Sequence, residues 1–393
     1  MGLTRCRHDF SYMSPRAKEP DTPQSITRNL RNLDIAAPIR SKHMYCNMMF
    51  TVAAYLVEQL SGLTFEEFLK QHFWQPLGMN STHLQAKKAV ELGLPLAQGY
   101  VWRSNTETFA PVERQYSPEA VGAGLINTSA NDYILWVKAL MNRQSPVTEE
   151  IYRALTKPRS LNLFPHPAPF TSPELYTAGL ATWWYRGYEV VDHDGLDPGF
   201  ASVHFFLPAL GFGGVMLSNS TSGRDVLIIL QRELIDVMLE VVESERVDWE
   251  SRQGEEEERD AVEEAEEKLA RRKRLCPDFR DGEALPLTTP LERYKGLYWD
   301  VGYHYMRVDI SSDDKLMIDA TDRTMGFTMT LEHLCEQRKF LAKTVDYYEW
   351  DEGELAVEFV LNEAGEKAVK MGLQLEEDLK DGMIWFDRVA ETS

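Results

Sequence analysis

Helical periods dominate the chain between residues 45 and 142. Residues 1 to about 43 are polar and proline-containing with no hydrophobic period, so we expect regular structure to begin at Tyr45. Between residues 47 and 60 the apolar positions recur at helical spacing. Residues 64–67 fit a capping box that opens a second helix, and residues 129–132 fit another that leads a helix through residue 141.

The pattern becomes β-rich between residues 181 and 218. Four runs of β-branched and aromatic residues are separated there by turn signals such as Asp197-Pro198-Gly199. Strands this close together predict an antiparallel meander, and residues 222–225 predict the start of an apolar helix that runs to about Val242. Because helices precede and follow an antiparallel sheet, we expect an α+β domain over residues 1–245.

Two further regions follow this domain. Residues 255–267 hold nine acids and one Arg, and residues 268–274 hold five bases. Pairs such as Glu264 and Lys268 stand four residues apart, so residues 246–284 are predicted to be a charged linker built on a solvated single helix. Residues 285–393 contain seven or eight short β-runs with polar turns, which predict a small antiparallel β-barrel or sandwich.

Charge and composition narrow the function. The chain of 393 residues carries 42 Lys and Arg against 62 Asp and Glu, a net charge of −20, which disfavours nucleic acid or an anionic membrane as partner. No apolar run is long enough for a transmembrane helix and the N-terminus has no signal-peptide pattern, so we expect a soluble, cytoplasmic protein. The four cysteines form no CxxC pair, which argues against a disulfide scaffold or a structural zinc site.

Two short segments carry candidate chemistry. Tyr45 and Asn47 would place a phenol and an amide at the start of a helix, although such a pair also occurs by chance. His193 and Gly195 follow a predicted strand, where a glycine would let a substrate lie close to the backbone. A surface or structural histidine is the alternative interpretation of His193.

Three blocks together resemble a known family. YCNMMFTVAAYLVEQLSGLTFEEFLKQHFWQPLGMNST resembles the Tyr-x-Asn region of the serine β-lactamase and penicillin-binding-protein-like superfamily, and GAGLINTSANDYILWVKALM resembles the block after it. HDGLDPGFASVHFFLP resembles the third motif, with His-x-Gly in place of Lys-Thr-Gly. The blocks occur in the family's order, and the nearest subset is the class C β-lactamase-like esterases and peptidases. The C-terminal region resembles the lipocalin-like domain often appended to these enzymes.

The resemblance implies serine-dependent hydrolysis or transfer of the acyl group of an ester or amide, without a cofactor. It assigns Tyr45 as general base and acid and Asn47 as a hydrogen-bond partner of the substrate amide. His193 would hold a substrate carboxylate or tune the tyrosine. The backbone from Gly195 to Gly199 would supply an oxyanion N–H.

The nucleophile motif of the family is missing from its expected place. Ser-x-x-Lys should precede Tyr45, yet residues 1–44 contain none, and the spacing from Ser14 to Lys18 is one residue too long. The chain's only Ser-x-x-Lys runs from Ser312 to Lys315, in a polar turn of the C-terminal region. We therefore expect the chain to begin after the nucleophile helix and to be inactive as given.

The sequence offers two alternatives to serine-dependent hydrolysis. A metal hydrolase is disfavoured because the nine histidines form no HxH or HExxH motif. A non-catalytic binding protein that uses the family's cleft remains the alternative, and the missing nucleophile favours it. In either case the expected partner is a small-molecule ester or amide. The sequence does not indicate the oligomeric state.

Overall fold

The computed structural model describes residues 9–162, 166–280, 286–350, 352–376, 379 and 382–391. Their contacts form two compact units. The first consists of the described residues of 37–45 and 49–253, and the second of those of 9–36, 46–48 and 254–391. The expected boundary between residues 284 and 285, like the chain before Asp9, lies outside the described residues.

Local signals mark the end of one helix of the first unit and the start of the next. Helix α2 spans Asn47–Ser61, and Gly62 ends it with a left-handed φ of 73°. Thr64 and Glu67 form the expected capping box of α3 (Phe65–Leu69). Further helical segments are η3, a π-helical turn (Lys70–Trp74), α4 (Gln75–Leu77), α5 (Ala86–Glu91), η4 (Pro118–Ala120), α7 (Glu149–Thr156) and η5 (Glu243–Glu245).

Two predicted helix starts differ from expectation. Ser129 caps α6 (Ala130–Asn142), but the Asp132 carboxylate accepts hydrogen bonds from Ser81 and Thr82, so the second capping box is only half formed. Helix α8 spans Gly223–Met238 and ends before Val242. The Ser222 hydroxyl does not cap it and bonds the hydroxyl of Ser220 instead.

A six-stranded antiparallel sheet forms the centre of the first unit, in the order β3-β4-β5-β6-β7-β8. Its strands are β3 (Ser160–Asn162), β4 (Glu174–Tyr176), β5 (Ala181–Tyr185), β6 (Tyr188–Asp197), β7 (Phe200–Leu207) and β8 (Phe212–Ser218). The predicted meander is confirmed as β5 to β8. A separate hairpin consists of β1 (Tyr100–Arg103) and β2 (Thr108–Pro111).

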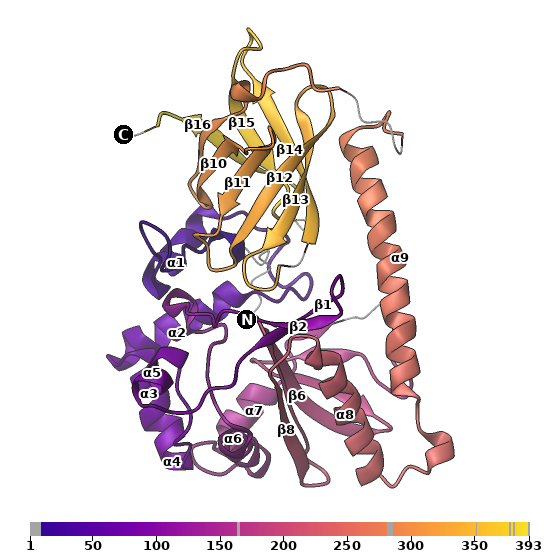
Figure 1. Cartoon of the computed structure of the whole chain (residues 1–393). Coiled ribbons are helices and arrows are strands. Elements are labelled where there is room, and N and C mark those ends of the chain that lie inside the picture. The colour runs from indigo at the N-terminus through magenta and orange to yellow at the C-terminus, as the bar shows by residue number, and fades with distance from the viewer. Residues whose placement is uncertain are drawn as a thin grey trace. The chain divides into compact units, whose positions relative to one another are not determined.

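Side chains alternate between the two faces of the sheet. One face packs on α8 through a core that includes Val203 and Phe205, and the other packs on α6 through Val191 and Phe206. Figure 1 shows α6 and α8 on opposite sides of the sheet. Within the described part of the chain, β8 pairs with β7 and no strand pairs with its outer side.

The N-terminal segment belongs to the second unit and is regular, contrary to expectation. It contains η1 (Asp9–Ser11), α1 (Pro23–Asn29) and η2 (Leu30–Asn32). Ser14 is fully buried and its hydroxyl donates to the carbonyl of Asp322 at 2.8 Å. Because this segment is stabilised by packing on the distant C-terminal residues, it needs no hydrophobic period of its own.

The C-terminal strands close into an eight-stranded antiparallel barrel, which confirms the α+β class with an appended barrel. The strands are β9 (Gly296–Asp300), β10 (His304–Ile310), β11 (Leu316–Ala320), β12 (Phe327–Cys335), β13 (Lys339–Asp346), β14 (Glu352–Leu361), β15 (Ala368–Leu373) and β16 (Ile384–Val389), with η6 (Leu291–Arg293) before them. Strand β9 pairs with both β10 and β16 and so closes the barrel.

The charged segment forms the predicted single helix, α9 (Trp249–Leu275), and Lys268 pairs with Glu264 at 2.7 Å. Its basic end is not a free spacer. Arg271 donates to the carbonyl of Glu354 at 2.7 Å, and Arg272 donates to the carboxylate of that residue at 2.6 Å. Cys276 and Cys335 form a disulfide just beyond the helix, a pairing that the cysteine spacing did not indicate.

None of the described helices is long and apolar enough to cross a membrane alone. Helix α2 and the segment Phe65–Leu77 have the required length and composition only together, and the pair is bent by 78°.

Candidate active site

Tyr45 and His193 lie together in the first unit, with their ring centres 6.3 Å apart. The last residue of β6 that pairs with β5 is Asp192. From His193 to Asp197 the strand pairs, among the described residues, with β7 alone. No described strand pairs with residues 193–196 on the β5 side, within the part of the backbone where the sequence predicted an oxyanion N–H.

Tyr176 of β4 lies beside both residues and was not predicted. Its Oη is 3.1 Å from His193 Nε2, and its ring centre is 6.1 Å from that of Tyr45. Burial raises the pKa of the Tyr176 phenol well above its ordinary value, and the neighbouring Tyr45, Glu174 and Asp194 raise it further. Tyr176 is therefore a neutral phenol that can donate its proton in a hydrogen bond.

The hydrogen bonds of His193 define its protonated nitrogen. Nδ1 lies 2.5 Å from the carbonyl oxygen of Asp194. A carbonyl oxygen can only accept, so Nδ1 carries the hydrogen. In the neutral ring Nε2 must then be the acceptor, and Tyr176 is its donor.

A second imidazole and a hydroxyl complete the cluster. The His43 ring lies 4.9 Å from that of Tyr176, and its Nδ1 is 3.0 Å from the Oγ of Ser160. Ser160 is also the cross-strand partner of Tyr176. Burial lowers the pKa of His43 and Glu174 opposes this shift, which leaves a neutral imidazole beside a hydroxyl.

Gly195 lies close to a serine side chain of the neighbouring strand. A Cβ atom there would be 2.6 Å from the Oγ of Ser202, its partner on β7. Next to it, the Asp194 carboxylate is bound by Arg224 through Nε at 2.8 Å and Nη2 at 2.7 Å. The predicted oxyanion role of this backbone stays a prediction.

Asn47 opens α2 and belongs to the second unit. Its Nδ2 donates to the Asp9 carboxylate at 3.0 Å. The amide is thus held by a residue of the N-terminal segment, and its expected contact with substrate stays a prediction.

A buried carboxyl group lies next to His193 on the opposite face of the sheet. The Oδ2 of Asp192 accepts hydrogen bonds from Gln231 at 2.8 Å and from the Trp183 indole at 3.0 Å. Burial raises the pKa of Asp192 to about 7, against the two hydrogen bonds that lower it. The α8 face of β6 therefore holds a group that titrates near neutral pH.

His204 is the cross-strand partner of His193. It is buried, and its Nδ1 lies 2.9 Å from the hydroxyl of Tyr133. Burial lowers the pKa of His204 to about 3, so this ring stays neutral at physiological pH. The tyrosine–histidine pair of His204 is thus a buried counterpart of the one at His193.

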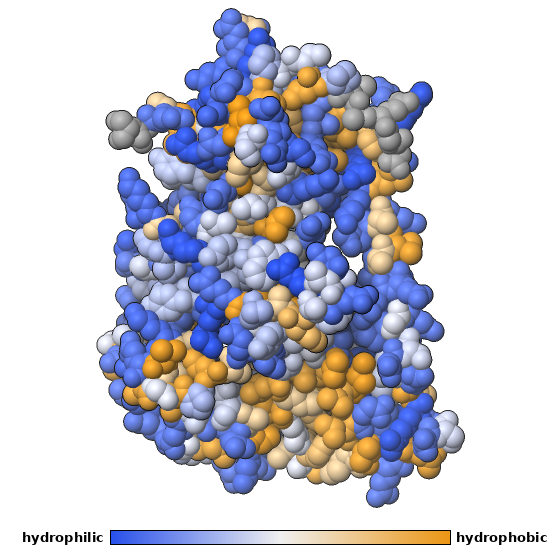
Figure 2. Space-filling view, viewed as in Figure 1, coloured by the Kyte–Doolittle hydropathy of each residue, from blue (hydrophilic) through white to orange (hydrophobic). Residues whose placement is uncertain are grey.

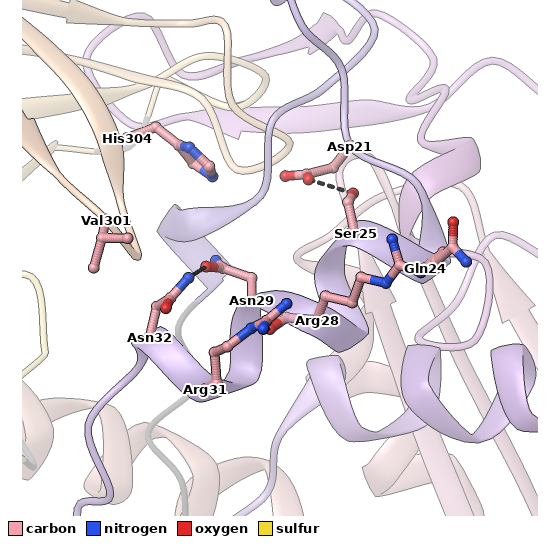
Figure 3. A pocket seen from close by; sticks show the side chains of 9 residues that line it. All are labelled: Asp21, Gln24, Ser25, Arg28, Asn29, Arg31, Asn32, Val301 and His304. Atoms are coloured by element: carbon pink, nitrogen blue, oxygen red, sulfur yellow. Dashed lines mark hydrogen bonds between the residues drawn. The ribbon is translucent and has the colours of Figure 1, made fainter.

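The other serines considered from the sequence are engaged elsewhere, in the second unit. Ser312 lies in the turn between β10 and β11, as predicted, and its hydroxyl is 3.4 Å from Asp313. A cavity of 230 Å³ in the same unit includes Arg28, Arg31 and His304 in its lining and none of the predicted site residues (Figure 3). No cluster of three or more metal-ligating side chains occurs among the residues with described positions.

Comparison with known proteins identifies the family of the chain. The family model described as Beta-lactamase matches residues 6–235, which include Tyr45, Tyr176 and His193. The chain belongs to the beta-lactamase family. A second model, a domain of unknown function, DUF3471, matches residues 282–388 and so covers the barrel of this family member.

Two curated relatives of this family member are unguisins hydrolases. The chain is 31% identical over 391 residues to the unguisins hydrolase of Aspergillus campestris. This alignment covers 98% of this chain and 71% of the relative. It is 33% identical over 351 residues to the unguisins hydrolase of Aspergillus violaceofuscus. This second alignment covers 83% of this chain and 60% of the relative. The chain thus spans less than two thirds of the second relative.

A solved structure supports the fold. An octameric penicillin-binding protein homologue from Pyrococcus abyssi matches with a TM-score of 0.50 and 18% identity, over 98% of this chain and 77% of that one. At this identity the likeness concerns the fold alone.

The structure brings Tyr45 and His193 together and adds Tyr176, His43 and Ser160. Tyr176 and Ser160 lie on strands of three residues each, too short to show a β period. His43 stands in a segment without any period. The only feature of the sequence that concerns His43 is its place two residues before Tyr45, which alone does not predict a site residue.

Proposed function

We propose that this chain forms the substrate-binding and proton-transfer part of a hydrolase that cleaves a small-molecule amide or ester. The observation that supports it is the meeting of Tyr45, Tyr176 and His193 beside the open edge of β6. Tyr45 would exchange a proton with the attacking and leaving groups, and the edge would bind the substrate carbonyl. The unguisins hydrolases make an amide or ester of that kind the first substrate class to test.

We further propose that residues 1–393 alone do not form a Ser-x-x-Lys acyl-enzyme, since that motif is absent before Tyr45. Loss of a nucleophile lowers turnover by several orders of magnitude and leaves only the contribution of binding. The protein should give no burst and no covalent adduct with a p-nitrophenyl ester, a chromogenic cephalosporin or a fluorophosphonate probe. A stoichiometric adduct mapped to Ser160 or Ser312 would contradict this proposal and identify the nucleophile.

The catalytic role of Tyr45 needs a protein that contains a nucleophile. A segment with Ser-x-x-Lys, fused before residue 1 or added as a separate peptide, should restore esterase activity. Tyr45→Phe should then lower kcat by about two to four orders of magnitude, the usual contribution of a general acid–base residue. Tyr188→Phe, a change of a tyrosine that is 38% exposed, is the matched control and should leave kcat unchanged.

A binding protein without catalysis is the second candidate, and the absent motif favours it. The two are distinguished by the restored protein. If it binds the substrate and shows no turnover while Tyr45→Phe has no effect, the chain is a binding protein.

A further inference from the structure

We propose that Tyr176 determines specificity in this site by occupying the Nε2 of His193, so that the site takes an uncharged amide or ester and rejects substrates with a free carboxylate. This inference rests on the proposed function and names its substrate class. It changes the role that the family resemblance implies for His193, which was to hold a substrate carboxylate.

The first step of the argument is the donor count at His193. Binding of a carboxylate needs an N–H or a cation that points to it. The Nδ1 hydrogen of His193 is used by the Asp194 carbonyl at 2.5 Å, and Nε2 accepts from Tyr176 at 3.1 Å. The neutral ring therefore has no hydrogen left for a substrate carboxylate.

The second step is the charge around the cluster. The carboxylates of Glu174 and Asp194 act on Tyr176, and Glu174 also acts on His43. Arg224, the cation next to them, is committed to Asp194 through two N–H groups. A substrate carboxylate would thus meet like charge and no free donor from His193, and such repulsion is an effective source of specificity.

The third step is the fixed position of Tyr176. Its ring lies against His43, Tyr45 and His193, with centre-to-centre distances of 4.9, 6.1 and 5.9 Å. Its strand partner Ser160 bonds the first of these rings. With neighbours on several sides, Tyr176 cannot release Nε2 by a simple rotation of its side chain.

The proton assignment can be tested without turnover. In the 393-residue protein with ¹⁵N-histidine, long-range ¹H–¹⁵N spectra at pH 8 should show His193 as the Nδ1–H tautomer, with the signal assigned through His193→Gln. Tyr176→Phe should shift the Nε2 resonance of His193 and leave His204 unchanged. Tyr133→Phe, the matched control, should shift His204 and leave His193 unchanged. An Nε2–H tautomer for His193 in the unmodified protein would overturn the proposal.

The specificity is tested with a matched ligand pair, hippurate and hippuramide, which differ only in carboxylate and amide. Calorimetry at low salt should show tighter binding of hippuramide by at least about tenfold, equivalent to about 1.4 kcal/mol. Tyr176→Phe should reduce this preference about tenfold, and Tyr133→Phe should not change it. Equal binding of both ligands, or a preference that Tyr176→Phe leaves intact, would overturn the inference while the proposed cleft stands. If neither ligand binds to any variant, the proposed function itself fails, and the inference fails with it.

Discussion

Replacing Asp192 with Asn should make the protein more stable at pH 8 and hardly change it at pH 4. Asp192 is partly buried between β6 and α8, and its pKa of about 7 compares with an ordinary value of 3.8. Between these two values the unfolded chain loses the proton while the folded chain keeps it. The unfolded state then binds fewer protons, so the free energy of unfolding falls as the pH rises from 4 to 7 and is constant above that.

The magnitude follows from the same values. At about 1.4 kcal/mol per pKa unit, the difference between the folded and unfolded pKa values of Asp192 corresponds to a loss of about 4 kcal/mol of unfolding free energy at high pH. Because the residue is partly exposed, we expect a loss of about 2–4 kcal/mol. Asn retains an oxygen for Trp183 and Gln231, which both donate to the same carboxylate oxygen. Its NH₂ group, which takes the place of Oδ1, offsets about 1 kcal/mol of the gain. We therefore expect Asp192→Asn to gain about 1–3 kcal/mol at pH 8.

The assay is urea unfolding from pH 4 to pH 8, followed by tryptophan fluorescence, which reports on the neighbouring Trp183. The difference in unfolding free energy between Asp192→Asn and the unmodified protein should rise with pH and level off above pH 7. Asp313→Asn, in an exposed turn, controls for the change in net charge and should give a flat difference. A flat difference for Asp192→Asn, or a loss of stability at pH 8, would refute the reasoning.

The other predictions concern surfaces. The exposed side of α8 carries Val226, Leu230 and Val237, and Figure 2 shows hydrophobic surface in the region of α8 and β8. We therefore expect the protein to bind a hydrophobic dye strongly and Leu230→Glu to reduce this binding. A protein that does not bind the dye would contradict this prediction. Proteolysis within α9 should leave the barrel folded, and its rapid loss would count against an independent unit. Arg16→Ala should lower the stability of the second unit by about 1–2 kcal/mol in thermal unfolding, because Arg16 donates to the Thr321 carbonyl at 2.6 Å and stacks on Tyr347. Lys18→Ala is the control. Equal losses of stability in the two variants would contradict this role of Arg16.

The fold was predictable where local signals are strong. The helix over 47–61 has an apolar period and a glycine at its end, and the strands β5 to β8 alternate and are separated by turns. The segment before residue 37 was misjudged because its burial depends on residues about three hundred positions later, such as Asp322. The half-formed capping box at Ser129 has a similar cause, since the carboxylate of Asp132 accepts a hydrogen bond from the backbone N–H of Ser81, which is distant in the sequence.

The site was predictable only as far as its motifs reach. Tyr45 and His193 were identified because they stand in blocks whose order is characteristic of a family. Tyr176 stands in no such block, and only the pairing of short strands brings it to His193. Contacts of this kind depend on tertiary structure, so residue type and spacing along the chain do not indicate them.

The contact between Tyr176 and His193 changes the chemistry expected of the third motif, which begins at His193. A lysine in the family's Lys-Thr-Gly motif has a compact cationic group with three donors. In this chain the corresponding His193 is a ring whose two nitrogens are both engaged, one by Asp194 and one by Tyr176. The family resemblance gives His193 the position of that lysine, but the neutral form of its ring has no N–H left for a substrate. In the proposed site this strand edge would bind the carbonyl of an acyl group and select against a neighbouring carboxylate, and Tyr176, rather than the motif itself, would make this distinction.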